Sequence, residues 1–104
     1  MVATAKKLSK AQQFIKGMIR HRGIEFAQIG MMVEVDGAIG TIQGMNDSAN
    51  LDVVFTNKLK YGNHAHNCHP TWRVKYFDAD GKLIAHHDGD RWLVRPDQKE
   101  ATNE

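Results

Sequence analysis

The chain has 104 residues, of which 41% are hydrophobic and 25% are charged, and this composition fits one folded domain rather than two domains or a disordered chain. No apolar run approaches the roughly 20 residues that cross a bilayer, and the first residues lack the apolar stretch of a secretory signal. The single cysteine cannot form an internal disulfide. We therefore expect a cytoplasmic protein without membrane contact. The net charge of +2 is uneven, because residues 1–30 hold six basic side chains against one acidic one, whereas the other 74 residues hold eight against eleven.

The N-terminal part of the chain predicts a basic arm followed by an amphipathic helix. Residues 1–8 have no apolar period and are expected to form a flexible arm. Ser9 and Gln12 have the spacing of a capping box and Gly23 suits a left-handed C-cap, so we predict a helix over residues 9–23. Its apolar face, which we expect to cover the following domain or to dock on a partner, consists of Ala11, Phe14, Ile15, Met18 and Ile19.

From Gly30 onward the apolar period changes to two, which predicts β-strands. Val33 and Val35 alternate with polar residues, and the following Asp36-Gly37 pair is typical of a two-residue hairpin turn. The return strand over residues 38–45 contains glycines, which mark bends in small curved sheets. Further strands are expected over residues 51–55, 72–77, 82–87 and 91–95, before a polar tail at 96–104. The pattern favours a small antiparallel barrel or sandwich.

The segment from Gly30 to Ile42, continued by residues 50–55, resembles the first three strands of SH3-like barrels. More narrowly it resembles the KOW motif of ribosomal proteins and transcription elongation factors, in which a G-x-x-V-x-V opening leads into a glycine-bearing second strand. The resemblance implies a mainly β fold, an SH3-like barrel over residues 30–95, and binding to RNA, ribosomal surfaces or RNA polymerase. The sequence departs from KOW hairpins at Glu34 and Asp36, because such hairpins are usually basic near the turn.

The stretch 56–70 is long for a plain connection and contains a cluster of histidines. In an extended segment His64, His66 and Cys68 point to one side, and imidazole with thiolate suits zinc. Structural zinc sites take ligands from two separated pairs, and only residues 86–87 offer a second pair, so we expect a polar loop with a buried cysteine and no metal or other cofactor. The sequence shows no group that would orient a Cys68–His69 nucleophile, and we predict no catalytic residue and no enzyme activity.

Two aromatic residues allow alternative interpretations. Trp72 follows Pro70 and is large enough to anchor a small core, and this role is favoured over a stacking platform for a nucleic-acid base. For Tyr61 both roles remain open, because nothing in the surrounding loop is expected to bury it.

These features favour a non-enzymatic binding module that acts on nucleic acid or on a nucleic-acid-handling complex such as the transcription or translation machinery. The alternatives are a small bacterial or phage protein–protein adaptor or inhibitor that binds a host protein and, less favoured, a metal-stabilised domain. Exposed strand edges also allow a homodimer. The residues expected to contact nucleic acid or a partner are Lys6, Lys7, Lys10, Lys16, Arg20, Arg22, Lys58, Lys60, Tyr61, Arg73 and Lys75.

Overall fold

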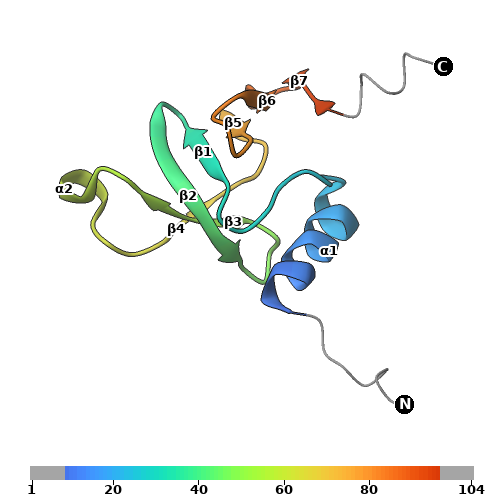
Figure 1. Cartoon of the computed structure of the whole chain (residues 1–104), viewed down its shortest axis with the longest axis horizontal. Helices are drawn as coiled ribbons and strands as arrows, with labels where there is room; N and C mark the ends of the chain where they lie inside the picture. The colour runs from blue at the N-terminus through green and yellow to red at the C-terminus, as the bar shows by residue number, and fades with distance from the viewer. Residues whose placement is uncertain (1–8, 97–104) are drawn as a thin grey trace.

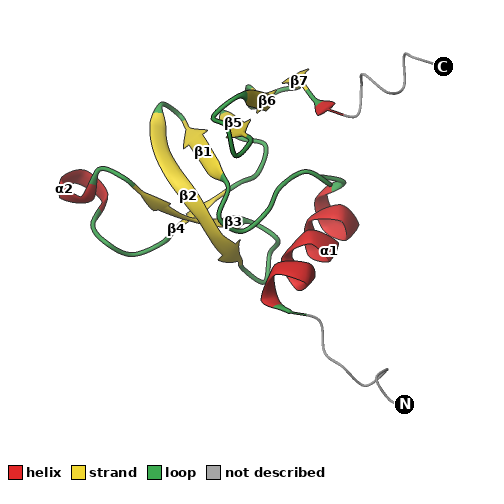
Figure 2. Cartoon of the chain, in the orientation of Figure 1, coloured by secondary structure: helices red, strands yellow, loops and turns green. Residues whose placement is uncertain are grey.

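The computed structural model describes residues 9–96, so the predicted arm at 1–8 and residues 97–104 of the predicted tail lie outside the described residues. The described chain is mainly β, with its longer helix near the N-terminus, as expected (Figures 1 and 2). The elements in chain order are α1 (Lys10–Arg22), β1 (Met32–Val35), β2 (Ala38–Met45), β3 (Leu51–Phe55), α2 (Lys58–Tyr61), β4 (His66–Cys68), β5 (Val74–Phe77), β6 (Leu83–His87) and β7 (Trp92–Val94).

Helix α1 is fixed at both ends by its own sequence. The Ser9 hydroxyl accepts a hydrogen bond from the backbone amide of Gln12 at 3.1 Å. In return, the side-chain oxygen of Gln12 accepts one from the backbone amide of Ser9 at 2.9 Å. Gly23 ends the helix with a φ of 67°, and its N–H donates to the Ile19 carbonyl. These caps satisfy backbone groups that the helix leaves without intrahelical partners.

The seven strands form one antiparallel sheet in the order β4-β3-β2-β1-β5-β6-β7. The β1–β2 hairpin turns at Asp36 and Gly37, whose φ values of 49° and 90° both lie in the left-handed region that a two-residue turn requires. The described strands form an open sheet, because the order begins at β4 and ends at β7 and no ladder joins these two edges.

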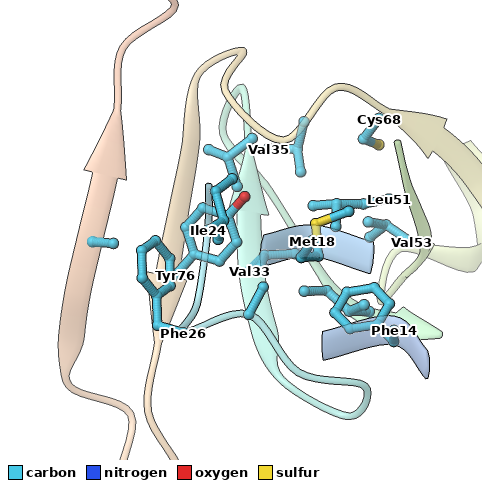
Figure 3. Packing of buried hydrophobic residues seen from close by; sticks show 14 of the residues in the cluster. Phe14, Met18, Ile24, Phe26, Val33, Val35, Leu51, Val53, Cys68 and Tyr76 are labelled. Carbon is cyan, nitrogen blue, oxygen red and sulfur yellow. The ribbon is translucent and has the colours of Figure 1, made fainter. Parts of the chain in front are cut away.

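The core lies between one face of the sheet and a layer made by α1 and the segment that follows it (Figure 3). Phe14 and Met18 are the buried residues of α1, and Ile24 and Phe26 from the connection to β1 are buried beside them. The sheet contributes its alternating residues: Val33, Val35, Ile42, Leu51, Val53, Phe55, Cys68, Val74, Tyr76 and Ala85. The predicted apolar face of the helix is therefore only partly buried, since Ile19 is 49% exposed.

The chain between β3 and β5 differs most from the sequence expectation. Residues 56–70 contain the single-turn helix α2 and the short strand β4, which pairs with β3, and the apolar period predicts neither. The core role predicted for Trp72 is wrong, because this side chain is 48% exposed. Arg73 has a φ of 55°, which interrupts the alternation, so that β5 begins only at Val74. No helix within residues 9–96 combines the length and apolarity needed to cross a membrane.

Candidate functional site

Seven of the nine predicted contact residues that the structure describes lie on two helices, α1 and α2, at opposite ends of β2 (Figure 1). Helix α1 lies near the end of β2, where a Cβ added to Gly17 would meet the Met45 side chain. Helix α2 follows β3, whose Phe55 pairs with Gly40 near the start of β2. Because β2 has eight residues, the two ends are separated by about 25 Å of strand.

Helix α1 carries exposed basic residues that we call the α1 stripe: Lys10, Lys16, Arg20 and His21. The helix contains no acidic residue. None of the ion pairs within residues 9–96 involves a stripe residue. A shallow hollow of about 510 Å³ on the surface of α1 is bordered by Lys16, Ile19, Arg20 and His21. The stripe is thus a positively charged surface without a carboxylate partner in the described structure.

Arg22 belongs to the same helix but has a different environment. Its Nε donates to the Ala49 carbonyl at 3.0 Å, and Nη2 donates to the Ser48 carbonyl at 3.1 Å and to Asn50 Oδ1 at 2.7 Å. These bonds hold the turn between β2 and β3, in which Ala49 has a φ of 61°. The structure therefore places Arg22 in the fold and not on the α1 stripe.

His69 lies against the same guanidinium. Its Nδ1 accepts a hydrogen bond from the Thr71 amide at 3.2 Å, and its Nε2 lies 3.2 Å from Arg22 Nη1. Burial lowers the pKa of His69, and the positive charges of Arg22 and His87 lower it further. The lowered pKa favours the neutral imidazole at pH 7.

At the other end of β2, α2 forms a basic projection that we call the α2 knuckle: Lys58, Leu59 and Lys60. Asn57 caps it by accepting a hydrogen bond from the Lys60 amide at 3.1 Å. Leu59 is fully exposed, with a relative accessibility of 102%. The Tyr61 ring packs 4.5 Å from the Phe55 ring, which explains how this loop tyrosine is partly buried. The knuckle is therefore supported from below by an aromatic contact with the core.

The histidines after the knuckle make local contacts. The His64 and His66 rings stack with centroids 4.5 Å apart, and His66 Nε2 donates to the Tyr61 carbonyl at 2.7 Å. Cys68 is buried, and this burial, together with the charge of Asp52, raises the pKa of its thiol to about 11. A thiol with so high a pKa stays protonated at neutral pH and is a poor nucleophile and metal ligand.

The last two predicted contact residues are engaged in ion pairs with the β1 side of the sheet. Arg73 Nη1 lies 3.1 Å from Asp36 Oδ1, and Lys75 Nζ lies 3.5 Å from Glu34 Oε2. The Arg73 guanidinium also lies 5.4 Å from the Trp72 ring. The acidic residues Asp36 and Glu34, which distinguish this hairpin from a basic one, are thus paired with Arg73 and with Lys75 of β5.

One cleft contains none of the residues selected from the sequence. It has a volume of about 790 Å³ and lies between the start of β1 and the β5–β6 turn, with apolar walls formed by Phe26, Ile29, Met31, Met32, Phe77 and Ile84. Its lining comes from segments far apart in the chain, and only the adjacent methionines Met31 and Met32, which suit adaptable apolar surfaces, signal it in the sequence.

Within residues 9–96, no three His, Cys, Asp or Glu side chains are grouped so as to hold a metal ion, and the candidate ligands His64, His66 and Cys68 make the contacts described above. Comparison of the chain with protein-family models, with curated proteins and with solved structures finds no match.

Proposed function

We propose that this protein is a non-enzymatic binding module that contacts nucleic-acid phosphates through the α1 stripe. The observation that carries the proposal is the absence, among the described residues, of any carboxylate paired with Lys10, Lys16 or Arg20. A lysine or arginine paired with a carboxylate is already neutralised, whereas an unpaired one can neutralise a phosphate and release the counterion condensed on the nucleic acid. Lys6 and Lys7, outside the described residues, directly precede this helix in the sequence and add to the same charge.

This mode of binding is expected to be largely independent of sequence. Lysine and arginine side chains on the outside of a helix contact the phosphate backbone, which carries no base information. The described α1 stripe presents no Phe, Tyr or Trp side chain for stacking on a base. We therefore expect similar affinity for different sequences and strong dependence on salt.

A relation to SH3-like barrels of the KOW type is part of the proposal. The hairpin with its Asp36-Gly37 turn, and the buried Gly40 in the second strand, support it. The ion pairs of Glu34 and Asp36 leave the hairpin close to neutral, so we assign the phosphate contacts to α1 instead of the hairpin.

A salt series tests this function. Binding of the full chain to fluorescently labelled single-stranded DNA, duplex DNA and RNA is measured by anisotropy at increasing salt concentration. The proposal predicts affinity that falls steeply with salt for all three ligands. Affinity that is the same at low and high salt would rule out the phosphate-binding function.

A protein–protein adaptor is the second candidate, and the full exposure of Leu59 favours it. This apolar side chain, flanked by two exposed lysines on a projecting turn, is available for contact with a partner. Capture experiments with nuclease-treated lysate, using the wild type and a Leu59→Ser variant, test this alternative. A specific partner that the wild type captures and the variant does not would support it, whereas equal capture by both would contradict it.

A further inference from the structure

The α2 knuckle has features that the fold does not require. Leu59 is fully exposed, and Lys58 and Lys60 on either side of it are exposed as well. Figure 1 shows α2 standing out from the sheet on the side away from α1. The knuckle is therefore an apolar side chain between two positive charges, held on a supported projection.

A second surface has the complementary character, and we call it the Trp72 patch: Trp72, Asp88, Gly89 and Asp90. The Trp72 ring lies next to Gly89, where an added Cβ would be 3.8 Å from Trp72 Cδ1. Asp88 accepts hydrogen bonds from the Asp90 and Arg91 amides, and these bonds lower its pKa and keep it ionised. Arg73, whose Cγ also lies beside Gly89, is paired with Asp36, so with Arg91 included the two carboxylates of the turn retain an excess of negative charge. The patch is a half-exposed aromatic ring beside two carboxylates.

The strand registers place the knuckle and the patch at the same end of the sheet. Gly40, near the start of β2, pairs with Phe55 shortly before the knuckle. Val35, at the end of β1, pairs with Val74, the residue that follows Trp72 and Arg73 in the chain. Val74 also pairs with His87, the residue that precedes the 88–91 turn. One end of the sheet thus carries a basic apolar projection and an acidic aromatic patch, separated by the width of the strands between them.

We propose that this end of the sheet is a self-association surface, where the α2 knuckle of one copy binds the Trp72 patch of a second copy. Since both surfaces lie at one end, a single twofold axis lets each copy supply the knuckle to the other's patch, which closes the dimer. Leu59 contacts the exposed Trp72 ring, and Lys58 and Lys60 face Asp88 and Asp90. Tryptophan is among the residues that contribute most binding energy at interfaces, and opposite charges select the register.

A pair of charge variants tests this arrangement without altering the α1 stripe. The first variant, Lys58→Glu with Lys60→Glu, makes the knuckle acidic. The second variant, Asp88→Asn with Asp90→Lys, makes the patch basic, and asparagine at 88 still accepts the hydrogen bonds of the turn. The full-length wild type, each variant and their equimolar mixture are studied by sedimentation velocity, without nucleic acid, from low micromolar to high concentration.

The proposal predicts that the wild-type mass rises with concentration from 11.7 kDa toward twice that value. Each variant alone stays monomeric, because knuckle and patch then carry the same sign. Their mixture dimerises, because each acidic knuckle meets a basic patch and each basic knuckle meets an acidic patch. A wild type that stays monomeric at all concentrations, or variants that each dimerise as the wild type does, would overturn the proposal.

A leucine pair separates this surface from the exposed β7 edge of the sheet. Leu59→Ser is expected to abolish the dimer, whereas Leu93→Ser, which alters a leucine 46% exposed on β7, is expected to leave it intact. Circular dichroism spectra and melting curves of every variant confirm that it folds. Loss of the dimer in Leu93→Ser but not in Leu59→Ser would place the interface at the β7 edge and contradict the proposal.

Discussion

Arg22 Nη2 donates a 2.7 Å hydrogen bond to Asn50 Oδ1, which joins the last turn of α1 to the turn between β2 and β3. Two residues earlier in the helix, Arg20 is exposed and has no carboxylate partner in the described structure. Residues of one type in one helix turn thus have separate roles, Arg22 in folding and Arg20 in the proposed contact with phosphate.

This difference predicts opposite effects of two matched substitutions. Arg22→Ala removes the bonds to the 48–50 turn and leaves its acceptors unpaired, so we expect the free energy of unfolding to fall by about 1–3 kcal/mol. Arg20→Ala is expected to change it by less than about 0.5 kcal/mol, as is usual at the surface. Urea unfolding followed by circular dichroism measures both. Equal loss of stability in the two variants would contradict the assigned roles.

The buried Tyr76 hydroxyl donates to the Pro70 carbonyl at 2.6 Å, and burial raises the pKa of this phenol well above its usual value. This bond fastens the crossing segment between β4 and β5 to the core. Tyr76→Phe keeps the ring and leaves the carbonyl without its donor, so we predict a loss of about 1–2 kcal/mol in unfolding free energy. Denaturant titration of the wild type and Tyr76→Phe measures this loss of unfolding free energy. An unchanged unfolding midpoint would show that the bond contributes nothing to stability.

Gly40 is required because β3 approaches it closely. A Cβ at this position would lie 2.6 Å from Val53 Cγ1 and 2.8 Å from the Val54 carbonyl oxygen, and backbone cannot move aside as a side chain can. Gly40→Ala is expected to lower stability by about 1–3 kcal/mol. Gly44→Ala in the same strand is the control, because its nearest neighbour would be Lys10 Cε at an ordinary 3.6 Å. Thermal melting should therefore separate the two variants.

His69 makes stability depend on pH. Its pKa in the folded state lies below the ordinary histidine value of 6.5, so the unfolded chain takes up a proton more readily. This group does not affect the unfolding free energy well above pH 6.5, and it lowers that free energy as the pH falls below 6.5. In His69→Asn, which keeps an acceptor near the Thr71 amide, urea titrations from pH 7.5 to 5 should show a smaller decline than in the wild type. An identical pH dependence would contradict this role.

Cys68 is predicted to be unreactive in the folded protein. Burial is the main cause that raises its pKa from 9.0 to about 11. At pH 8 the folded chain then holds about 100-fold less thiolate than the unfolded chain, and thiolate is the reactive form. Reaction with an aromatic disulfide reagent should therefore be slower in buffer than in denaturant. Similar rates in both solvents would show that the thiol is accessible.

The parts of the fold that follow from the sequence are those that short-range chemistry determines. The Ser9–Gln12 capping box, the left-handed Gly23 and the Asp36-Gly37 turn each depend on residues within a few positions of one another. The alternation of apolar residues in β1 and β3 likewise identifies which side chains face the core.

The remaining features depend on contacts between distant segments. Trp72 continues the alternation of Val74 and Tyr76, and only the left-handed Arg73, held by the Asp36 amide and carboxylate, turns it outward. Helix α2 is a single turn supported by the Asn57 cap and by the Phe55–Tyr61 contact, and a single turn is too short to show a helical period.

The candidate site was predictable as a list of basic residues but not as surfaces. Composition does not distinguish Arg20 from Arg22, because the acceptors of Arg22 lie 26 to 28 residues away. Nor does it show that Arg73 and Lys75 are paired with Asp36 and Glu34.

Phosphate binding by α1 is tested most directly by the slope of log affinity against log salt concentration for duplex DNA, measured with the wild type and with Lys16→Ala/Arg20→Ala. A control, Lys82→Ala/Arg91→Ala, removes the same charge from exposed residues outside α1. Each lost phosphate contact reduces the slope by about 0.9, so we predict a slope about 2 units smaller for the α1 variant and little change for the control. Equal slopes for the wild type and the α1 variant would contradict it.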